Sequence, residues 1–163
     1  MLVRPAEESF RNGIESLQRG RGIEALAFLE AALLIERRQG VERPQARYLS
    51  FYGFCLGLET KRLAEGIRYC RDALELEFFN ADLSWNLGRL LVKADERAEA
   101  YAAFQKGLDI QPGHPGIVRE LRRMGTRRRP PLLFLARNNP VNVVLGRLTY
   151  AGHDRQKNGA ASR

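Results

Sequence analysis

The sequence predicts an all-α protein built from repeated pairs of helices, and three observations indicate this fold class. Good helix formers, chiefly Ala, Leu, Glu and Arg, dominate the first two thirds of the 163 residues. Apolar residues recur three and four positions apart, which places them along one face of a helix, and the alternating pattern typical of strands is missing. One pattern of small and large residues also occurs three times, which indicates a repeated structural unit.

The repeated pattern is a small residue, a larger apolar residue and a second small residue, at spacings of four and three. Its three copies are Ala25-Leu29-Ala32, Gly66-Cys70-Ala73 and Ala100-Phe104-Gly107. A glycine precedes each copy by 12 or 13 residues, in Asn12-Gly13, Tyr52-Gly53 and Leu87-Gly88. Glycine inside a helix costs about 1 kcal/mol relative to Ala. Its recurrence at matching places therefore predicts that two helices approach closely there, with larger side chains beside the contact.

The spacing of these copies divides the chain into three predicted hairpins, over residues 6–39, 46–80 and 81–114. The interval from Ala73 to Gly107 is 34 residues, whereas the interval from Ala32 to Ala73 is 41. The surplus lies in a loop at residues 37–44, which Gly and Pro mark. The first junction is therefore expected to be longer than the second.

A capping helix is expected after the third hairpin, over residues 115–125. Pro115 suits a first helical position, and Gly125 would end the helix. Between them lies an apolar stripe made of Ile117, Val118, Leu121 and Met124. Such a helix covers the apolar face that a last repeat would otherwise expose. These elements together predict a repeat domain over residues 1–125.

The units resemble tetratricopeptide repeats (TPRs), whose pattern has Trp, Leu-Gly and Tyr in the first helix, Ala and Phe in the second, and a closing Pro. The third unit matches through Leu87-Gly88, Leu91, Ala100, Phe104 and Pro112, with Trp85 one place past the family's Trp position. The second unit keeps Tyr52-Gly53, Leu56, Cys70 and Ala73 but lacks the Pro. The first is degenerate, and its inward face is either Asn12-Gly13-Ser16 or Phe10-Gly13-Leu17.

This resemblance to small bacterial TPR proteins implies a right-handed α-solenoid of three TPR hairpins plus the capping helix. It also implies a function in binding another protein or a peptide, because stacked TPR hairpins form a concave groove lined by the first helix of each pair. The residues expected to line that groove are Phe10, Ile14, Arg47, Ser50, Phe54, Trp85, Arg89 and Lys93.

Aromatic anchors ringed by Arg are typical of binding hot spots. The hypothesis is that Phe54 and Trp85 grip apolar side chains, while the cations of Arg47, Arg89 and Lys93 hold carboxylates. The alternative is that Phe54 and Trp85 are core residues. Some TPR proteins bind a C-terminal carboxylate with a Lys/Asn clamp, but Phe10 and Ile14 stand at the first two positions of that clamp. A chaperone tail is therefore not the expected ligand.

Charge is distributed unevenly along the chain. Residues 1–117 carry 16 Lys and Arg against 17 Asp and Glu, whereas residues 118–163 carry 11 against 2. An excess of this kind favours an acidic partner, an anionic membrane surface or a nucleic acid. The alternative function is therefore a surface-tethering module whose tail binds anions through Arg122, Arg123, Arg127, Arg128 and Arg129.

The tail, residues 126–163, is predicted to hold three parts. A basic linker comes first, then an apolar run at residues 132–135 and a short amphipathic helix that Asn139 and Pro140 begin. Residues 151–163 have the composition of a disordered end. The apolar segment is expected to dock on the repeats, to bind a partner, or to lie on a membrane.

Catalysis and cofactor binding find no support in the sequence. Cys55 and Cys70 are too few for a disulfide framework or a zinc site, and both fall at apolar helix positions, where core packing is expected. His114 lies in a predicted turn, and no Walker loop, HExxH motif or nucleophile elbow is present. No apolar run has the length of a signal peptide or a membrane span. We therefore expect a cytoplasmic protein that is not an enzyme and needs no cofactor.

Overall fold

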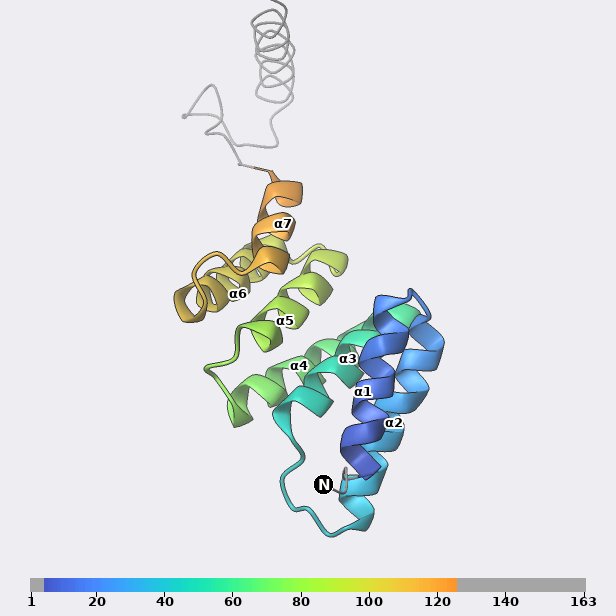
Figure 1. Ribbon diagram of the computed structural model, residues 1–163. Helices are drawn as coiled ribbons and strands as arrows, with labels where there is room; N and C mark the ends of the chain where they lie inside the picture. The colour runs from blue at the N-terminus through green and yellow to red at the C-terminus, as the bar shows by residue number, and fades with distance from the viewer. Residues whose placement is uncertain (1–4, 126–163) are drawn as a thin grey trace, which may run out of the picture. The chain divides into compact units, whose positions relative to one another are not determined.

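The computed structural model describes residues 5–125 of the chain. This part is entirely helical, and Figure 1 shows its seven helices: α1 (Pro5–Gln18), α2 (Gly22–Arg38), α3 (Ala46–Glu59), α4 (Leu63–Leu76), α5 (Ala81–Lys93), α6 (Arg97–Ile110) and α7 (Pro115–Met124). Consecutive helices pair as α1/α2, α3/α4 and α5/α6, and α7 packs on the last pair. The predicted all-α fold of three hairpins and a capping helix is confirmed. The predicted C-terminal amphipathic helix lies outside the described residues.

The helices pair where glycine leaves room for the partner helix. A Cβ atom on Gly13 of α1 would lie 2.8 Å from Leu29 of α2, and one on Gly88 of α5 would overlap the ring of Phe104 in α6. In the middle hairpin, a Cβ on Gly66 would lie 2.5 Å from the carbonyl oxygen of Gly53, so the backbones themselves are in contact. The close approach that the repeated pattern predicts is therefore present in all three hairpins.

The core follows the same pattern. The small and large residues of the three copies are buried, and most have no exposed surface, as in Ala25, Leu29, Ala32, Cys70, Ala73, Ala100 and Phe104. Cys55 and Cys70 are both fully buried as free thiols. Burial raises the pKa of each thiol to about 12, so both stay protonated at neutral pH. The prediction that the cysteines pack in the core is confirmed.

Helix α1 buries residues from both alternatives given for its inward face. Gly13 closes against α2, and Ser16 is buried with it. Phe10 is also buried, but its ring contacts Tyr48 and Phe51 of α3, at centroid distances of 4.7 and 5.7 Å. The helix therefore uses Gly13 to pair within its own hairpin and Phe10 to pack against the next.

The longest connection, residues 39–45, joins the first two hairpins. Helix α2 ends as Gly40 adopts a left-handed conformation at φ 72°, and the N–H of Val41 donates to the carbonyl of Glu36 across 3.1 Å. This is the arrangement that commonly closes a helix at glycine. The connection then runs to Gln45, which precedes α3.

The backbone contact in the middle hairpin predicts a loss of stability in Gly66→Ala. The added methyl group would clash with the carbonyl oxygen of Gly53 and with backbone atoms of Gly57. Backbone atoms, unlike a flexible side chain, cannot move away by changing rotamer. Overpacking of this kind costs about 1–3 kcal/mol, which exceeds the gain of about 1 kcal/mol in helix propensity. We expect a lower free energy of unfolding in urea.

Ala102→Gly is a suitable reference for this measurement, because Ala102 is exposed in the middle of α6. That change should lower the free energy of unfolding by about 1 kcal/mol through propensity alone. If propensity alone decided the outcome, Gly66→Ala would be more stable than the parent chain, and the contact between α3 and α4 would then be looser than described.

Candidate partner-binding site

The candidate site lies on the first helices of the hairpins, α1, α3 and α5, beside the capping helix α7. Of the eight residues predicted to line it, Ser50 and Phe54 have no exposed surface and Phe10 is 8% exposed. Ile14, Arg47, Trp85 and Arg89 are half-buried, and Lys93 is exposed. The eight residues thus come from the expected helices, but they do not form one exposed wall.

Phe54 is covered by a residue of the next hairpin. The guanidinium carbon of Arg89 lies 4.3 Å from the centre of the Phe54 ring and 5.1 Å from that of Trp85. Phe54 and Ser50 have no surface to offer a partner, and Ser50 instead accepts a hydrogen bond of 3.2 Å from the side chain of Asn86. The expectation that Phe54 grips a partner is therefore wrong, because Arg89 occupies the space above its ring.

Arg89 keeps hydrogen-bonding capacity. Within residues 5–125 the polar contact of its guanidinium is an ion pair with Glu120 of α7, and this is too long for a hydrogen bond, at 3.8 Å from Nε to Oε1. Glu120 also pairs with Arg123, across 3.5 Å. Burial lowers the pKa of Arg89 below its usual value, since the charged form loses hydration. Arg89 is thus a partly desolvated cation stacked between two aromatic rings.

Trp85 lies between α5 and α7. A Cβ on Gly116 would be 2.5 Å from the indole ring, so the start of α7 rests directly on Trp85. The indole N–H is buried and has no hydrogen-bond partner within the described residues. Trp85 therefore joins α5 to the capping helix and is half-buried there, with Arg89 over its ring. We refer to these two residues as the Trp85–Arg89 pair.

His114 has a role that sequence reasoning missed. Its Nδ1 accepts a hydrogen bond of 3.2 Å from the N–H of Ile117, which satisfies a free donor in the first turn of α7. Because Nδ1 accepts, the ring proton lies on Nε2, which faces the Asp82 carboxylate at 3.0 Å. The position directly before Pro115 was the available signal for this capping role.

Lys93 of α5 binds the C-terminal end of α3, the first helix of the preceding hairpin. Its Nζ donates to the carbonyls of Gly57 and Leu58, at 2.8 and 2.7 Å, in the last turn of α3. A cation is favourable there, because the end of a helix presents free carbonyls and a partial negative charge. Two of the three ammonium donors are therefore engaged, and the carboxylate-holding role expected of Lys93 stays a prediction.

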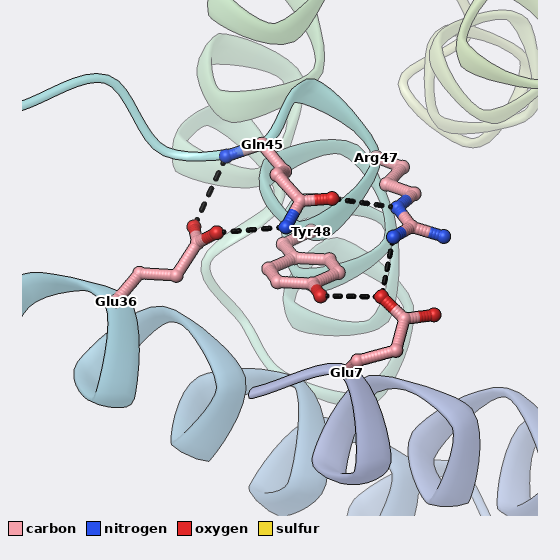
Figure 2. A network of polar contacts seen from close by, with 5 residues as sticks. All are labelled: Glu7, Glu36, Gln45, Arg47 and Tyr48. Atoms are coloured by element: carbon pink, nitrogen blue, oxygen red, sulfur yellow. Dashed lines mark hydrogen bonds and ion pairs between the residues drawn. The ribbon is translucent and has the colours of Figure 1, made fainter. Parts of the chain in front are cut away.

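Arg47 belongs to a polar network that joins the first two hairpins, and Figure 2 shows it. Its Nε donates to Gln45 across 2.9 Å, and its guanidinium pairs with the Glu7 carboxylate, which also accepts a 2.7 Å hydrogen bond from Tyr48. Buried Glu36 accepts from the backbone and side-chain nitrogens of Gln45, at 3.0 and 2.9 Å. The network ties α1, α2 and α3 together across the long connection.

The guanidinium of Arg47 is occupied by contacts within the chain. Its guanidinium carbon also lies 5.1 Å from the centre of the Phe10 ring, so Arg47 covers Phe10 much as Arg89 covers Phe54. Because Glu7 neutralises Arg47 within the chain, a partner carboxylate would have to displace that ion pair. Among the three cations expected to hold carboxylates, Arg89 is the one with the most free hydrogen-bonding capacity.

The predicted tail site falls mostly outside the described residues. Arg122 and Arg123 are exposed in the last turn of α7, while Arg127, Arg128 and Arg129 lie beyond residue 125. No helix within residues 5–125 is long and apolar enough to cross a membrane. The same residues contain no group of three His, Cys, Asp or Glu side chains placed to hold a metal ion.

Comparison with solved structures places this architecture among known folds. The crystal structure of YrrB, a TPR protein with an unusual peptide-binding site, matches with a TM-score of 0.57 at 20% sequence identity. The match covers 72% of this chain and 57% of that chain, so this chain spans somewhat more than half the length of YrrB. The fold is therefore that of the TPR proteins. No protein-family model and no curated protein sequence matches the chain.

The capping role of His114 predicts its stability effect. His114→Ala removes the acceptor for the Ile117 N–H and should lower the free energy of unfolding by about 1 kcal/mol, as other lost N-caps do. His114→Asn should lose less, since Asn is a favoured N-cap residue. Thermal unfolding followed by circular dichroism measures both. Equal losses in the two variants would show that the ring packing against Trp85, and not the cap, is what matters.

The network also predicts a pH effect. Burial and the hydrogen bond to Glu7 raise the pKa of Tyr48 to about 12, above the value of about 10 in an unfolded chain. The stability that Tyr48 contributes is therefore complete below pH 10 and is lost as the pH rises towards 12. Tyr48→Phe lacks this titration, so its free energy of unfolding should fall less steeply across that range. Parallel curves for the two proteins would rule out the raised pKa.

Proposed function

We propose that the chain is a non-catalytic cytoplasmic module that binds a partner protein or peptide on the face shared by α1, α3 and α5. The Trp85–Arg89 pair is the centre of this contact. The observation that carries the proposal is the state of Arg89, whose guanidinium stacks on two rings yet makes no hydrogen bond within the described residues. The TPR fold and the peptide-binding site of the similar protein YrrB support the same function.

The chemistry of Arg89 indicates what the partner offers. A guanidinium has five donors in a planar fork that matches a carboxylate, and partial burial strengthens the ion pair relative to one in open water. The long pair with Glu120 is weak enough for a ligand carboxylate to replace it. Trp85 is half-buried and its ring centre lies 5.1 Å from the guanidinium carbon of Arg89, so an apolar neighbour of the bound carboxylate would contact Trp85. The ligand is then an acidic side chain or terminal carboxylate next to an apolar residue.

The state of the nucleophilic and basic side chains supports a non-catalytic role. Cys55 and Cys70 are buried thiols whose pKa is raised to about 12, so neither supplies a thiolate near neutral pH. Both ring nitrogens of His114 are engaged, by the α7 backbone and by Asp82. These groups are used in packing and capping, which leaves binding as the function that the described residues favour.

The basic end of the chain favours a second candidate, a surface-tethering module. Eleven of the 27 Lys and Arg residues fall in residues 118–163, against two acidic residues. In this alternative, Arg122, Arg123 and Arg127–Arg129 bind an anionic membrane or a nucleic acid. Binding through phosphates weakens steeply with salt, whereas binding to the Trp85–Arg89 pair is less sensitive. Deleting residues 126–163 would remove three of these five arginines and so abolish or strongly weaken tethering, while the first-helix contact stays intact.

Tryptophan fluorescence offers a direct test, because Trp85 is the only tryptophan in the chain. Peptides selected from a random display library on the full-length protein should change the Trp85 emission on binding. Arg89→Gln should weaken the selected peptides about tenfold or more, since a hydrogen bond to a charged group contributes about 1.5–3 kcal/mol.

Arg68→Gln provides the matched control. Arg68 is an exposed cation on the second helix α4, and it also lies over an aromatic ring, that of Tyr69, at 5.6 Å. Its replacement removes the same charge and a similar stacking contact away from the proposed site. Equal losses in the two variants would indicate binding by net charge alone and would contradict the assigned face, as would peptides that leave Trp85 emission unchanged.

A further inference from the structure

Two adjacent phenylalanines stand exposed in the turn between α4 and α5. Phe78 is 76% exposed and Phe79 63%, and their rings meet edge to face at a centroid distance of 5.5 Å. Leu76, the last residue of α4, is 41% exposed beside them. We call these three residues the aromatic turn. Large apolar side chains that are clustered and solvent-exposed mark interaction sites in soluble proteins.

The repeat itself shows that this turn does not need aromatic residues. Thirty-four residues later, one repeat length, the equivalent turn between α6 and α7 has Pro112 and Gly113 in place of Phe78 and Phe79. The residue that follows caps the next helix in both turns: Asn80 accepts from the N–H of Asp82 at 3.1 Å, as His114 does from Ile117. Both turns have the same length and end in a capping residue, although Gly113 adopts a left-handed φ of 80° and Phe79 does not. The cap therefore does not depend on the two phenyl rings.

The charges around the aromatic turn indicate the kind of partner. Residues 72–88 contain four acidic side chains and no Lys or Arg, the acids being Asp72, Glu75, Glu77 and Asp82. Asp72 and Glu75 are exposed and form the acidic rim of the aromatic turn, whereas Asp82 pairs with His114 at 3.0 Å. Arg71, just before this segment, is held by Glu99 at 2.8 Å. A surface of this charge repels phosphates and attracts cations, which disfavours an anionic membrane or a nucleic acid.

From these observations we infer that the aromatic turn docks a cationic, apolar peptide segment of a partner protein. The two rings and Leu76 bury the apolar side chains of the segment, and the acidic rim orients its Lys or Arg residues. Aromatic residues at the centre with charges at the edge are the composition of an interaction hot spot. This surface is distinct from the Trp85–Arg89 pair and has the opposite charge, so it does not depend on the function proposed above.

The test uses the full-length protein and a short synthetic peptide of Arg and Leu residues that ends in a C-terminal amide, so that it carries no carboxylate for Arg89. Binding is followed by fluorescence anisotropy of the labelled peptide. The double variant Phe78→Ser and Phe79→Ser should weaken binding about tenfold or more, as loss of hot-spot residues does. Asp72→Asn with Glu75→Gln should weaken it about threefold and flatten its dependence on salt. Arg89→Gln should leave binding unchanged.

Tyr101→Ser serves as the control, because Tyr101 is an aromatic residue 53% exposed on α6, outside the aromatic turn. It should bind the peptide as the parent does. All four variants alter partly exposed side chains, and their melting curves by circular dichroism establish that each is folded. A folded double Phe variant with parent affinity would overturn the proposal. So would equal binding, by the Arg89→Gln variant, of a peptide with Glu in place of Arg, because that variant lacks the cation of the other proposed site.

Vesicles of phosphatidylcholine and phosphatidylglycerol provide the last arm of the experiment. The acidic rim should keep the protein from binding them through the aromatic turn. Vesicle binding that the double Phe variant abolishes would replace the peptide with a lipid surface as the occupant, and the inference would be wrong. Vesicle binding that the double variant retains would arise elsewhere in the chain and agrees with the inference.

Discussion

The close approach of two helices at a glycine is the contact on which the rest of this structure depends. At Gly53 and Gly66 the backbones of α3 and α4 touch, and no side chain larger than hydrogen fits at either position. The hairpin is therefore held at a fixed separation, and large side chains such as Phe104 in α6 fill the space at an equivalent glycine, Gly88. The positions of the first helices, which carry the candidate site, are therefore set by packing against the second helices.

Different contacts join one hairpin to the next. Arg47 of α3 covers Phe10 of α1, and Arg89 of α5 covers Phe54 of α3. Lys93 caps the end of α3 from α5. A cation on a first helix thus stabilises its contact with the preceding hairpin, either by stacking on an aromatic ring or by binding the free carbonyls at the end of a helix. Stacking and partner binding compete for the same side chains, and only the surplus capacity, greatest at Arg89, remains for a partner.

This competition explains how far the sequence could predict the structure. The hairpins can be predicted from local spacing, because each glycine and the larger side chain that packs against it lie within one unit, as Gly13 and Leu29 do. Whether a first-helix residue is exposed depends instead on a side chain about one repeat away. Phe54 is covered by a residue 35 positions later, and its pattern alone fits a buried ring and a binding anchor equally well. The capping role of His114 had one local signal, its position before Pro115, but the hydrogen bond itself depends on how the first turn of α7 folds.

Comparison between units separates residues that the fold requires from residues that it does not. Positions where two units agree in chemistry, such as the capping positions of Asn80 and His114, serve the backbone in both. Phe78 and Phe79 stand where the other turn has Pro112 and Gly113, and their exposed rings take no part in the cap. A turn between repeats makes few packing contacts, so its side chains can change without disturbing the glycine contacts that hold the hairpins. The same array of hairpins can therefore carry two candidate surfaces of opposite charge, the Trp85–Arg89 pair on a first helix and the aromatic turn between two repeats.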